Sequence, residues 1–339
     1  MKKILILGVN GFIGSGMVEQ ILSQTDWEIF GMDLDDSKIK DFLSHPNFTF
    51  VKGNMLDEDD WVENHIKLCD VIFPLVAVAN PALYVTDPLH VYQLDYEANV
   101  DIVKLCVKHN KHLVFPSTSE VYGMSTDIPF DEYTSKLVTG PINKQRWIYS
   151  CSKQLLDRVI HAYGLQKGLN YTLFRPFNWI GPKQDNLKSS KNGSARVLVQ
   201  FITNIRDGKP LQLVDGGMQK RCFTYIDDGI QGLIEIIRQS DKSFQEIFNF
   251  GNPLNEFTIK ELAELTIEAM KKYPKYKENA MNTEIVETNS ENYYGKGYQD
   301  VDRRVPSINN AKQKLNWVPK VDMLEALQRT LDFHFLEEK

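Results

Sequence analysis

Cysteine and histidine are scarce in this sequence, and neither is arranged for disulfide or metal chemistry. The four cysteines (Cys69, Cys106, Cys151 and Cys222) lie far apart without a C-x-x-C pair, and the seven histidines do not cluster. Scattered cysteines argue against a disulfide framework and favour reduced thiols. We therefore expect a cytoplasmic protein without a metal site.

Long apolar runs and an excess of positive charge are also missing. No stretch of apolar residues is long enough to cross a bilayer. The formal net charge is −6, so the sequence offers no basic surface for nucleic acid or for an anionic membrane. We expect neither of these as a partner.

The composition that remains is that of a soluble globular protein. Of the 339 residues, 42% are hydrophobic and 25% are charged, which is enough apolar material to build a core. A chain of this length forms one large domain, or a large and a small one.

A glycine-rich turn follows the first predicted strand, Ile4–Leu7, and a helical pattern begins at Met17. In such a turn Gly8 permits the tight bend, Gly11 lets the backbone approach a pyrophosphate, and Gly14 lets the helix pack closely. The N–H groups of the helix N-terminus then face the phosphates. The sequence therefore predicts a dinucleotide site, although a purely structural turn is the alternative. The expected contacts are Gly8, Asn10, Gly11, Phe12, Ile13 and Gly14.

An acidic residue, Asp33, stands at the end of the second predicted strand. A carboxylate there accepts hydrogen bonds from both ribose hydroxyls and repels a 2′-phosphate, which favours NAD over NADP as the cofactor. Asp35 and Asp36 follow directly, and a loop-capping aspartate is the alternative interpretation of Asp33. We expect Asn54 and Met55, after the third strand, to lie near the adenine.

Short apolar runs alternate with helical patterns along most of the chain, which is typical of βαβ units and a parallel sheet. The predicted strands are Ile4–Leu7, Glu28–Met32, Phe48–Val51, Val71–Val78, His112–Phe115, Tyr171–Phe174, Leu211–Val214, Phe223–Ile226 and Ile247–Phe250. Helical patterns cover Pro88–His109, Trp147–Gly164, Ile259–Met270 and Met323–Phe335.

This pattern predicts an α/β fold, with a doubly wound parallel Rossmann sheet and a smaller α/β substrate-binding domain. We expect residues 1–175 to form the NAD-binding domain, with a later segment of about 215–253 returning to it. Residues 176–339 then form mainly the substrate domain.

Tyr149 and Lys153 are four residues apart in a predicted helix, so their side chains share one face. A lysine cation beside a tyrosine favours the phenolate and lowers the pKa of the phenol, which makes the pair a proton acceptor for a sugar or alcohol hydroxyl. Alone, such a pair is more often a solvated helix face. The run Ser117–Thr118–Ser119, at the end of a strand about thirty residues upstream, supports a catalytic role.

Five longer motifs carry a resemblance to a known family. They are P-S-T-S-E-V-Y-G (116–123), R-W-I-Y-S-C-S-K-Q-L-L-D-R-V-I (146–160), L-F-R-P-F-N-W (173–179), D-G-G-M-Q-K-R-C-F-T (215–224) and Y-Y-G-K-G-Y-Q-D-V (293–301). With the glycine turn, they resemble the extended short-chain dehydrogenase/reductase family of nucleotide-sugar enzymes. Within that family they are closest to ArnA-type UDP-glucuronic acid decarboxylase domains, and more distantly similar to plant UDP-apiose/xylose synthases.

The resemblance implies an activity: NAD⁺-dependent oxidation of UDP-glucuronic acid at C4, followed by loss of C6 as CO₂ to leave a UDP-4-keto-pentose. It implies that Tyr149, Lys153 and Thr118 form the oxidation centre, that Ser119 and Glu120 assist decarboxylation, and that Arg304 supplies a positive charge. A carboxyl group next to an ionised substrate carboxylate is expected to have a raised pKa, and we expect this of Glu120. The implied nucleotide-sugar contacts are Ala79, Tyr84, Asn178, Arg196, Arg221 and Tyr298.

Several alternatives remain open from the residues alone. Glu120 is equally well explained as an exposed acid at a strand end, and Arg303–Arg304 as a solvated basic pair. A redox-neutral UDP-xylose synthase, a 4-epimerase and a non-catalytic nucleotide sensor are the competing functions. Apiose synthases carry a cysteine at the position of Ala79, so apiose formation is disfavoured. The apolar faces of Pro88–His109 and Trp147–Gly164 predict a homodimer.

Overall fold

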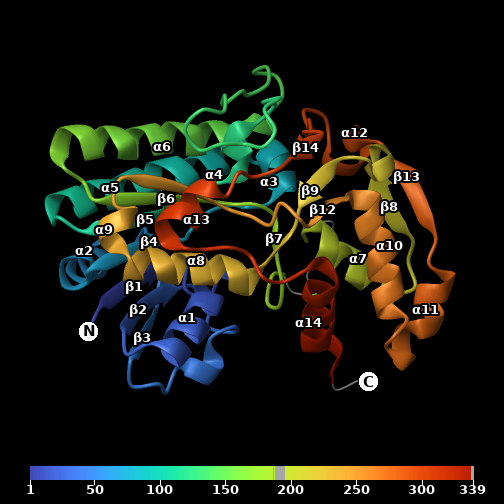
Figure 1. Cartoon of the computed structure of the whole chain (residues 1–339), viewed down its shortest axis with the longest axis horizontal. Coiled ribbons are helices and arrows are strands. Elements are labelled where there is room, and N and C mark those ends of the chain that lie inside the picture. Colours follow the sequence, from blue (N-terminus) through green and yellow to red (C-terminus); the bar gives the residue numbers. More distant parts are fainter. Residues whose placement is uncertain (186, 188–194, 337–339) are drawn as a thin grey trace.

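A seven-stranded sheet, parallel throughout, forms the centre of the molecule (Figure 1). The computed structural model describes residues 1–185, 187 and 195–336. The strand order is β11-β6-β5-β4-β1-β2-β3, in which the direction of winding reverses between β1 and β4. This is a doubly wound Rossmann sheet, and the predicted fold class is confirmed. The strands are β1 (Lys3–Leu7), β2 (Glu28–Asp33), β3 (Phe48–Lys52), β4 (Val71–Pro74), β5 (His112–Pro116), β6 (Tyr171–Pro176) and β11 (Glu246–Phe250).

Helices cover both faces of this sheet because each strand is apolar on both sides. In β1, Ile4 and Ile6 enter one core and Leu5 and Leu7 enter the other, and all four side chains are fully buried. The first core is closed by α1 (Phe12–Gln24) and α8 (Ile226–Arg238), and the second by α2 (Asp59–Leu68), α5 (Ala98–Lys108) and α6 (Trp147–Lys167).

Smaller sheets and helices pack beyond the carboxyl ends of the main strands, at the right of Figure 1. One sheet pairs β8 (Leu211–Val214) with β13 (Ile285–Thr288), and α7 (Val197–Arg206), α10 (Ile259–Met270) and α11 (Lys277–Asn282) lie beside it. A second has the order β12-β9-β14 and consists of β12 (Glu256–Thr258), β9 (Lys220–Cys222) and β14 (Arg303–Arg304). A short pair joins β7 (Trp179–Ile180) to β10 (Thr224–Tyr225), and the last helix is α14 (Met323–Phe335).

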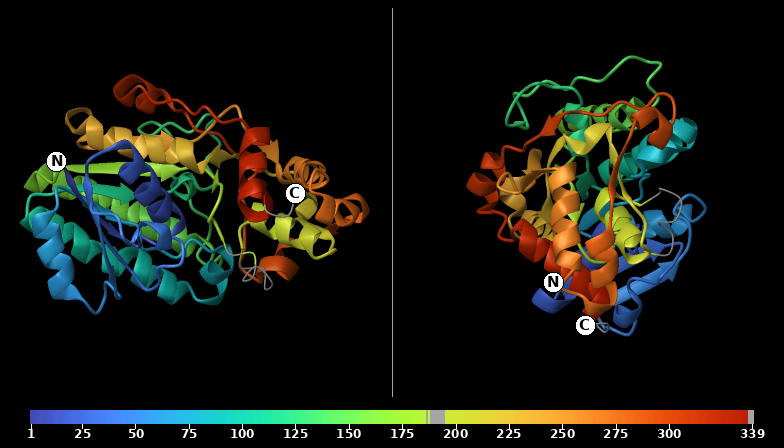
Figure 2. Two further views of the ribbon diagram at one scale, coloured as in Figure 1. Left: turned by 90° about the horizontal axis from the view of Figure 1, so that it is seen from below. Right: turned by 90° about the vertical axis from the view of Figure 1, so that its right-hand side faces the viewer.

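The left view in Figure 2 shows the order of the layers, with the long helices on either side of the sheet and the smaller elements at one end. Ligands of doubly wound proteins bind outside the carboxyl ends of the strands, near the reversal point. This fold therefore places the candidate site between the main sheet and the smaller elements. Among the described helices, none has both the length and the apolarity that a membrane span requires.

Three predicted elements are shortened or interrupted in the structure. The strand predicted over Val71–Val78 ends at Pro74, where the chain leaves the sheet at its carboxyl edge. The helix predicted over Pro88–His109 is three segments: α4 (Pro88–Tyr92), the π-helical turn Gln93–Glu97 and α5. The strand predicted over Phe223–Ile226 is only the two-residue β10, because Ile226 already begins α8.

Candidate active site

The glycine turn between β1 and α1 has the backbone that a dinucleotide phosphate requires. Gly8 has φ +84°, a conformation that favours glycine. A Cβ on Gly14 would lie 2.6 Å from the Gly8 carbonyl oxygen, so the helix can approach the turn only because this residue has no side chain. Gly11 is the N-cap of α1 and has no side chain to cap it. The first-turn N–H groups of α1, which include those of Phe12 and Ile13, can therefore bind an anion.

Asp33 lies directly beside this turn, at the end of β2. One carboxylate oxygen accepts the Asn10 backbone N–H at 2.8 Å and the other accepts the Leu34 N–H at 2.7 Å. Each oxygen retains lone pairs for a ribose hydroxyl. Asp35 is instead engaged by the Asn10 side-chain amide and by Ser37. Burial raises the pKa of Asp33, although its hydrogen bonds oppose the shift.

Asn54 and Met55 follow β3 as expected, but their side chains have local roles. The Asn54 amide donates to Asp57 at 2.9 Å and its oxygen accepts the Leu56 N–H. Met55 is buried in the core that covers one face of the sheet, with Met32. Their predicted contact with adenine stays a prediction.

Tyr149 and Lys153 meet Thr118 where α6 packs over the end of β5. Thr118 is the N-cap of the short helical turn η3 (Ser119–Tyr122), which begins where β5 ends. Its side chain lies next to that of Tyr149 and acts to lower the pKa of the phenol. The Lys153 Nζ lies 6.0 Å from the centre of the Tyr149 ring and donates to the Pro116 carbonyl at 3.2 Å. The three side chains predicted for the oxidation centre are therefore together.

The predicted lowering of the Tyr149 pKa is wrong for the chain by itself. Burial is the largest effect and raises the pKa of Tyr149 well above its usual range, and Asp95 and Glu120 raise it further. The neighbouring Thr118 hydroxyl and the charge of Arg196 oppose this rise. Sequence spacing placed Lys153 correctly but did not reveal that its ammonium is paired with a buried carboxylate, Asp95, at 3.3 Å.

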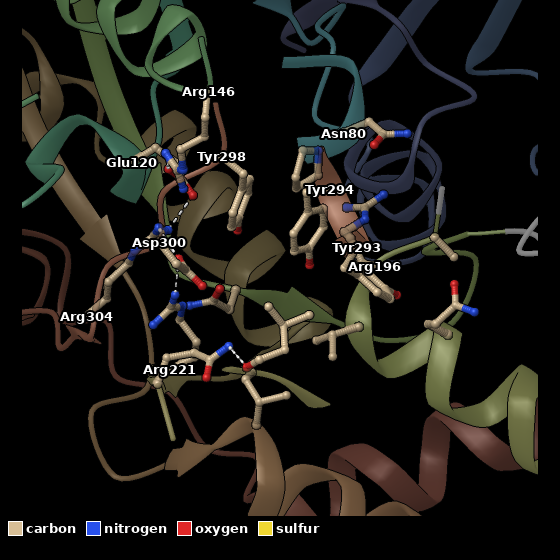
Figure 3. A pocket seen from close by; sticks show the side chains of 18 of the residues that line it. Asn80, Glu120, Arg146, Arg196, Arg221, Tyr293, Tyr294, Tyr298, Asp300 and Arg304 are labelled. Atoms are coloured by element: carbon tan, nitrogen blue, oxygen red, sulfur yellow. Dashed lines mark hydrogen bonds and ion pairs between the residues drawn. The ribbon is translucent and has the colours of Figure 1, made fainter. Parts of the chain in front are cut away.

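A pocket opens beside this centre, between the main sheet and the smaller elements (Figure 3). It encloses about 930 Å³, including the part that is open to solvent. Its polar lining is dominated by four arginines, two acids and three tyrosines: Arg146, Arg196, Arg221, Arg304, Glu120, Asp300, Tyr293, Tyr294 and Tyr298.

Glu120 lies between two buried arginines on one wall of the pocket. An Arg146 Nη1 lies 2.6 Å from one carboxylate oxygen, and Arg304 donates to the other. The two guanidinium groups outweigh the burial of Glu120 and hold its pKa well below its usual range. For the chain by itself, the pKa of Glu120 is therefore lowered and not raised, because Glu120 is a paired carboxylate; the raised pKa beside a bound substrate carboxylate stays a prediction. The interpretation of Glu120 and Arg304 as exposed charges is also excluded, since Arg304 is 4% exposed.

Arg221 continues this charged wall. Its Nη2 lies 2.6 Å from Asp300, and Arg304 approaches the same carboxylate at 3.7 Å. Burial lowers the pKa of Arg221, while Asp300 opposes the shift. Tyr298 adds an aromatic surface, with its ring stacked on that of Tyr294 at 4.1 Å.

The other predicted sugar contacts divide into two groups. Asn178 and Arg196 line the pocket, and the Asn178 side-chain nitrogen is buried without a hydrogen-bond partner in the described part of the chain. Tyr84 lies deeper, with its ring stacked on Tyr149 at 4.6 Å. Ala79 is not among the lining residues, and Asn80 takes its expected place. Ser119, predicted to assist decarboxylation, is not a lining residue either.

Comparison with known proteins agrees with this geometry. The model of the NAD dependent epimerase/dehydratase family matches residues 4–251. The chain belongs to this family. NAD is therefore its cofactor, and the glycine turn and Asp33 fit that molecule.

One similar structure, the PbgP3 protein from Burkholderia pseudomallei, is 49% identical, with 98% of this chain and 96% of that chain covered and a TM-score of 0.90. The UDP-glucose 4-epimerase of Thermotoga maritima, solved with UDP-glucose, is 22% identical over 99% of this chain and 100% of that chain, with a TM-score of 0.81. UDP-glucuronic acid 4-epimerase from Bacillus cereus is 21% identical over 98% of both chains, also with a TM-score of 0.81. The last two likenesses show that this epimerase/dehydratase has the same fold as those enzymes.

Sequence reasoning missed three charged residues of this epimerase/dehydratase site: Asp95, Arg146 and Asp300. The position of Arg146, directly before the helix that carries Tyr149, was a signal that could have found it. Asp300, four residues before Arg304, offered a weaker signal of the same kind. No sequence motif marks Asp95, because its role depends on a contact between two separate helical segments, its own and the helix that carries Lys153.

Proposed function

We propose that this protein catalyses NAD⁺-dependent oxidative decarboxylation of UDP-glucuronic acid to a UDP-4-keto-pentose. The observation that carries the proposal is the pair of buried arginines on either side of Glu120. With Arg221 and Asp300, three guanidinium groups share two carboxylates, which leaves one positive charge on this wall. Buried charges require partners, and a carboxylate on the sugar would supply one. A neutral hexose would not.

The first half-reaction is oxidation at C4. Tyr149 takes the proton of the C4 hydroxyl, and the neighbouring Thr118 hydroxyl supports the phenolate that this requires. Bound NAD⁺ supplies the acceptor for the hydride from C4 and a positive charge that favours the phenolate. Lys153 holds its own positive charge behind the ring.

The second half-reaction breaks the C5–C6 bond. The new C4 ketone is β to the C6 carboxylate, so CO₂ leaves and its bonding electrons pass into an enolate, after which C5 takes a proton from water. Arg146 and Arg304 would bind the departing carboxylate and stabilise the developing charge. The ionised Glu120, with Ser119 next to it, places a second negative charge beside the substrate carboxylate. Loss of CO₂ relieves this repulsion.

The remaining lining residues are proposed to hold the nucleotide. Asn178 offers a buried donor that has no partner among the described residues, and Arg196, Arg221 and Tyr298 line the same pocket. Tyr84 would fix the sugar against Tyr149, and Ala79 would lie near it. A UDP-sugar as the ligand is supported by two proteins of the same fold, a UDP-glucose 4-epimerase and a UDP-glucuronic acid 4-epimerase.

The test is incubation of the purified protein with UDP-glucuronic acid and stoichiometric NAD⁺, followed by NADH absorbance and proton NMR of the sugar. We expect NADH to accumulate together with a 4-keto-pentose. UDP-xylose without net NADH would instead mean a redox-neutral synthase, and UDP-galacturonic acid would mean a 4-epimerase. As a control, Tyr149→Phe should bind NAD⁺ normally and form no NADH. Turnover that survives this change would exclude Tyr149 as the base.

A further inference from the structure

A buried carboxylate that the proposed reaction does not use lies behind the Tyr149–Lys153 pair. Asp95 has an exposed fraction of 0%, and Lys153 has one of 1%. Charged side chains are rarely buried to this degree unless they are paired, and losing one partner of such a pair is costly. The pair therefore needs an explanation beyond simple packing, since two apolar side chains would fill the space as well.

The contacts of Asp95 fix the ammonium group of Lys153. One Asp95 oxygen lies 3.3 Å from Lys153 Nζ, and the other accepts the Val78 N–H at 2.9 Å. On its other side, Nζ donates to the Pro116 carbonyl at 3.2 Å and lies 4.8 Å from the centre of the Phe115 ring. The ammonium is thus held between the end of β5 and the π-helical turn that carries Asp95.

The backbone around Asp95 is irregular at this position. Residues Gln93–Glu97 form a π-helical turn between α4 and α5, and Asp95 is its only buried residue. A π-turn inserts one residue into an α-helix and is frequent at functional sites. The inserted turn here presents an acid to α6, against which this segment packs.

Several other charged or titratable groups face Tyr149. Lys153 comes from α6, Glu120 from η3, and Arg196 from the start of α7. Tyr84 stacks on the ring from α3 (Pro81–Thr86), and His90 on α4 faces Asp95. Of these, Asp95 is the negative charge that most strongly opposes ionisation of Tyr149, ahead of Glu120.

We propose that Asp95 is a positioning residue of the oxidation centre: it anchors Lys153, and as a fixed negative charge it opposes deprotonation of Tyr149. It thereby keeps Tyr149 a phenol until a cation, the oxidised nicotinamide ring, is bound beside it. The proposal rests on the role proposed above for Tyr149 and Lys153, but not on the identity of the sugar.

The test compares Asp95→Asn with the wild-type protein, both as NAD⁺ complexes. Asparagine keeps the shape and the acceptor for the Val78 N–H and removes only the charge. Tyrosine is labelled with carbon-13 at Cζ, and the Tyr149 signal is assigned by its absence in Tyr149→Phe. We expect the titration of Tyr149 in Asp95→Asn to move to lower pH by about one unit. An unchanged midpoint would overturn the proposal.

The control is Asp101→Asn, which removes a negative charge from the next helix, where Asp101 is exposed and pairs with Lys104 at 2.8 Å. It should leave the Tyr149 titration unchanged. A shift equal to that of Asp95→Asn would mean a general charge effect and would contradict the proposal.

Two further readouts keep the result interpretable. If a uronate substrate turns over, the acid limb of the pH profile of kcat should move in the same direction as the NMR titration, and kcat should fall about tenfold because Lys153 loses its anchor. If Asp95→Asn does not fold, the NMR titration of Tyr149 is compared between Lys153→Gln and the double variant Asp95→Asn, Lys153→Gln. In the double variant no buried charge is left unpaired. The NMR experiment needs no turnover, so failure of the proposed decarboxylation is distinguishable from failure of this proposal.

Discussion

Arg303 and Arg304 are neighbours in the sequence with opposite surroundings. Arg303 is exposed and pairs with Glu256 at 2.8 Å, whereas Arg304 is buried against Glu120 in the pocket wall. Their side chains have opposite surroundings because both residues lie in the strand β14, in which successive side chains point to opposite faces. The two residues form a matched pair for testing the carboxylate site.

Arg304→Met should lower kcat/KM for UDP-glucuronic acid by about 100-fold, because a buried partner of a substrate carboxylate is lost. Binding of UDP-glucose as a competitor should change little, since it has no carboxylate. Arg303→Met should behave as wild type in both assays. Equal losses for UDP-glucuronic acid and UDP-glucose would contradict a carboxylate-specific role.

The residues that could be predicted from sequence are those whose partners are near them in the chain. Tyr149 and Lys153 share a helix face, and Thr118 and Glu120 share one motif. Arg146 pairs with an acid 26 positions away and Arg304 with the same acid 184 positions away, so only the folded chain brings them together. Without those partners, the sequence could not show that the pKa of Glu120 is lowered in the chain by itself.

We expect cofactor binding to depend on the turn between β1 and α1. Gly14→Ala should reduce NAD⁺ affinity at least about tenfold, because the new Cβ would collide with backbone atoms of Gly8 and Val9. Gly16→Ala on the same helix meets only the flexible end of the Ile230 side chain, and should bind NAD⁺ as wild type does. Isothermal titration measures both. Similar affinities for the two variants would contradict the role assigned to the turn.

The edge strand β11 depends on a buried acid in the loop that follows η3. Glu132 is 6% exposed and accepts the Asn249 N–H of β11 at 2.8 Å. Burial raises the pKa of Glu132 to about 7, although Arg175 opposes the shift. The pKa of Glu132 is higher in the folded state than its unfolded value of about 4.5, so protonation of Glu132 stabilises the folded state. This stabilisation is fully present below pH 4.5 and is lost as the pH rises through about 7.

Ionisation of Glu132 should therefore lower the free energy of unfolding by about 3 kcal/mol between pH 5 and pH 8. Glu132→Gln keeps the acceptor and should flatten this part of the profile, making the variant more stable than wild type at pH 8. Glu278→Gln, at an exposed position, is the control. Urea denaturation at several pH values checks this, and parallel profiles for wild type and Glu132→Gln would contradict it.

The bounds of a helix could be predicted from the sequence where the spacing of its apolar residues and its length both indicated a helix. Ile259–Met270 and Met323–Phe335 have the predicted bounds, because each carries a regular apolar face and a side-chain N-cap. The π-turn inside the helix predicted over Pro88–His109 could not be predicted, since the burial of Asp95 against Lys153 gives no periodic signal.

At the scale of the whole molecule, α4, α5 and α6 lie side by side as one outer layer (Figure 1). Two of their leucines, Leu89 and Leu155, are 71% and 47% exposed. We propose that this layer pairs with its copy in a homodimer, because exposed apolar side chains on adjacent helices are typical of an interface. The predicted division into a cofactor domain and a substrate domain also stays a prediction at this scale.

Sedimentation should give twice the mass of one chain. The double variant Leu89→Glu, Leu155→Glu should be monomeric, and Leu254→Glu, in a loop outside this layer, should remain dimeric. A wild-type protein that sediments only as a monomer would contradict the proposed dimer.

The central claim is that the arginine-lined pocket removes the C6 carboxylate of a UDP-uronate. The most direct measurement is release of labelled CO₂ from UDP-glucuronic acid that carries carbon-13 at C6, in the presence of NAD⁺. We predict one labelled CO₂ for each NADH formed by the wild-type protein, and about 100-fold slower release of labelled CO₂ by Arg304→Met at low substrate concentration. NADH formation or epimerisation with the label retained in the sugar would contradict the claim.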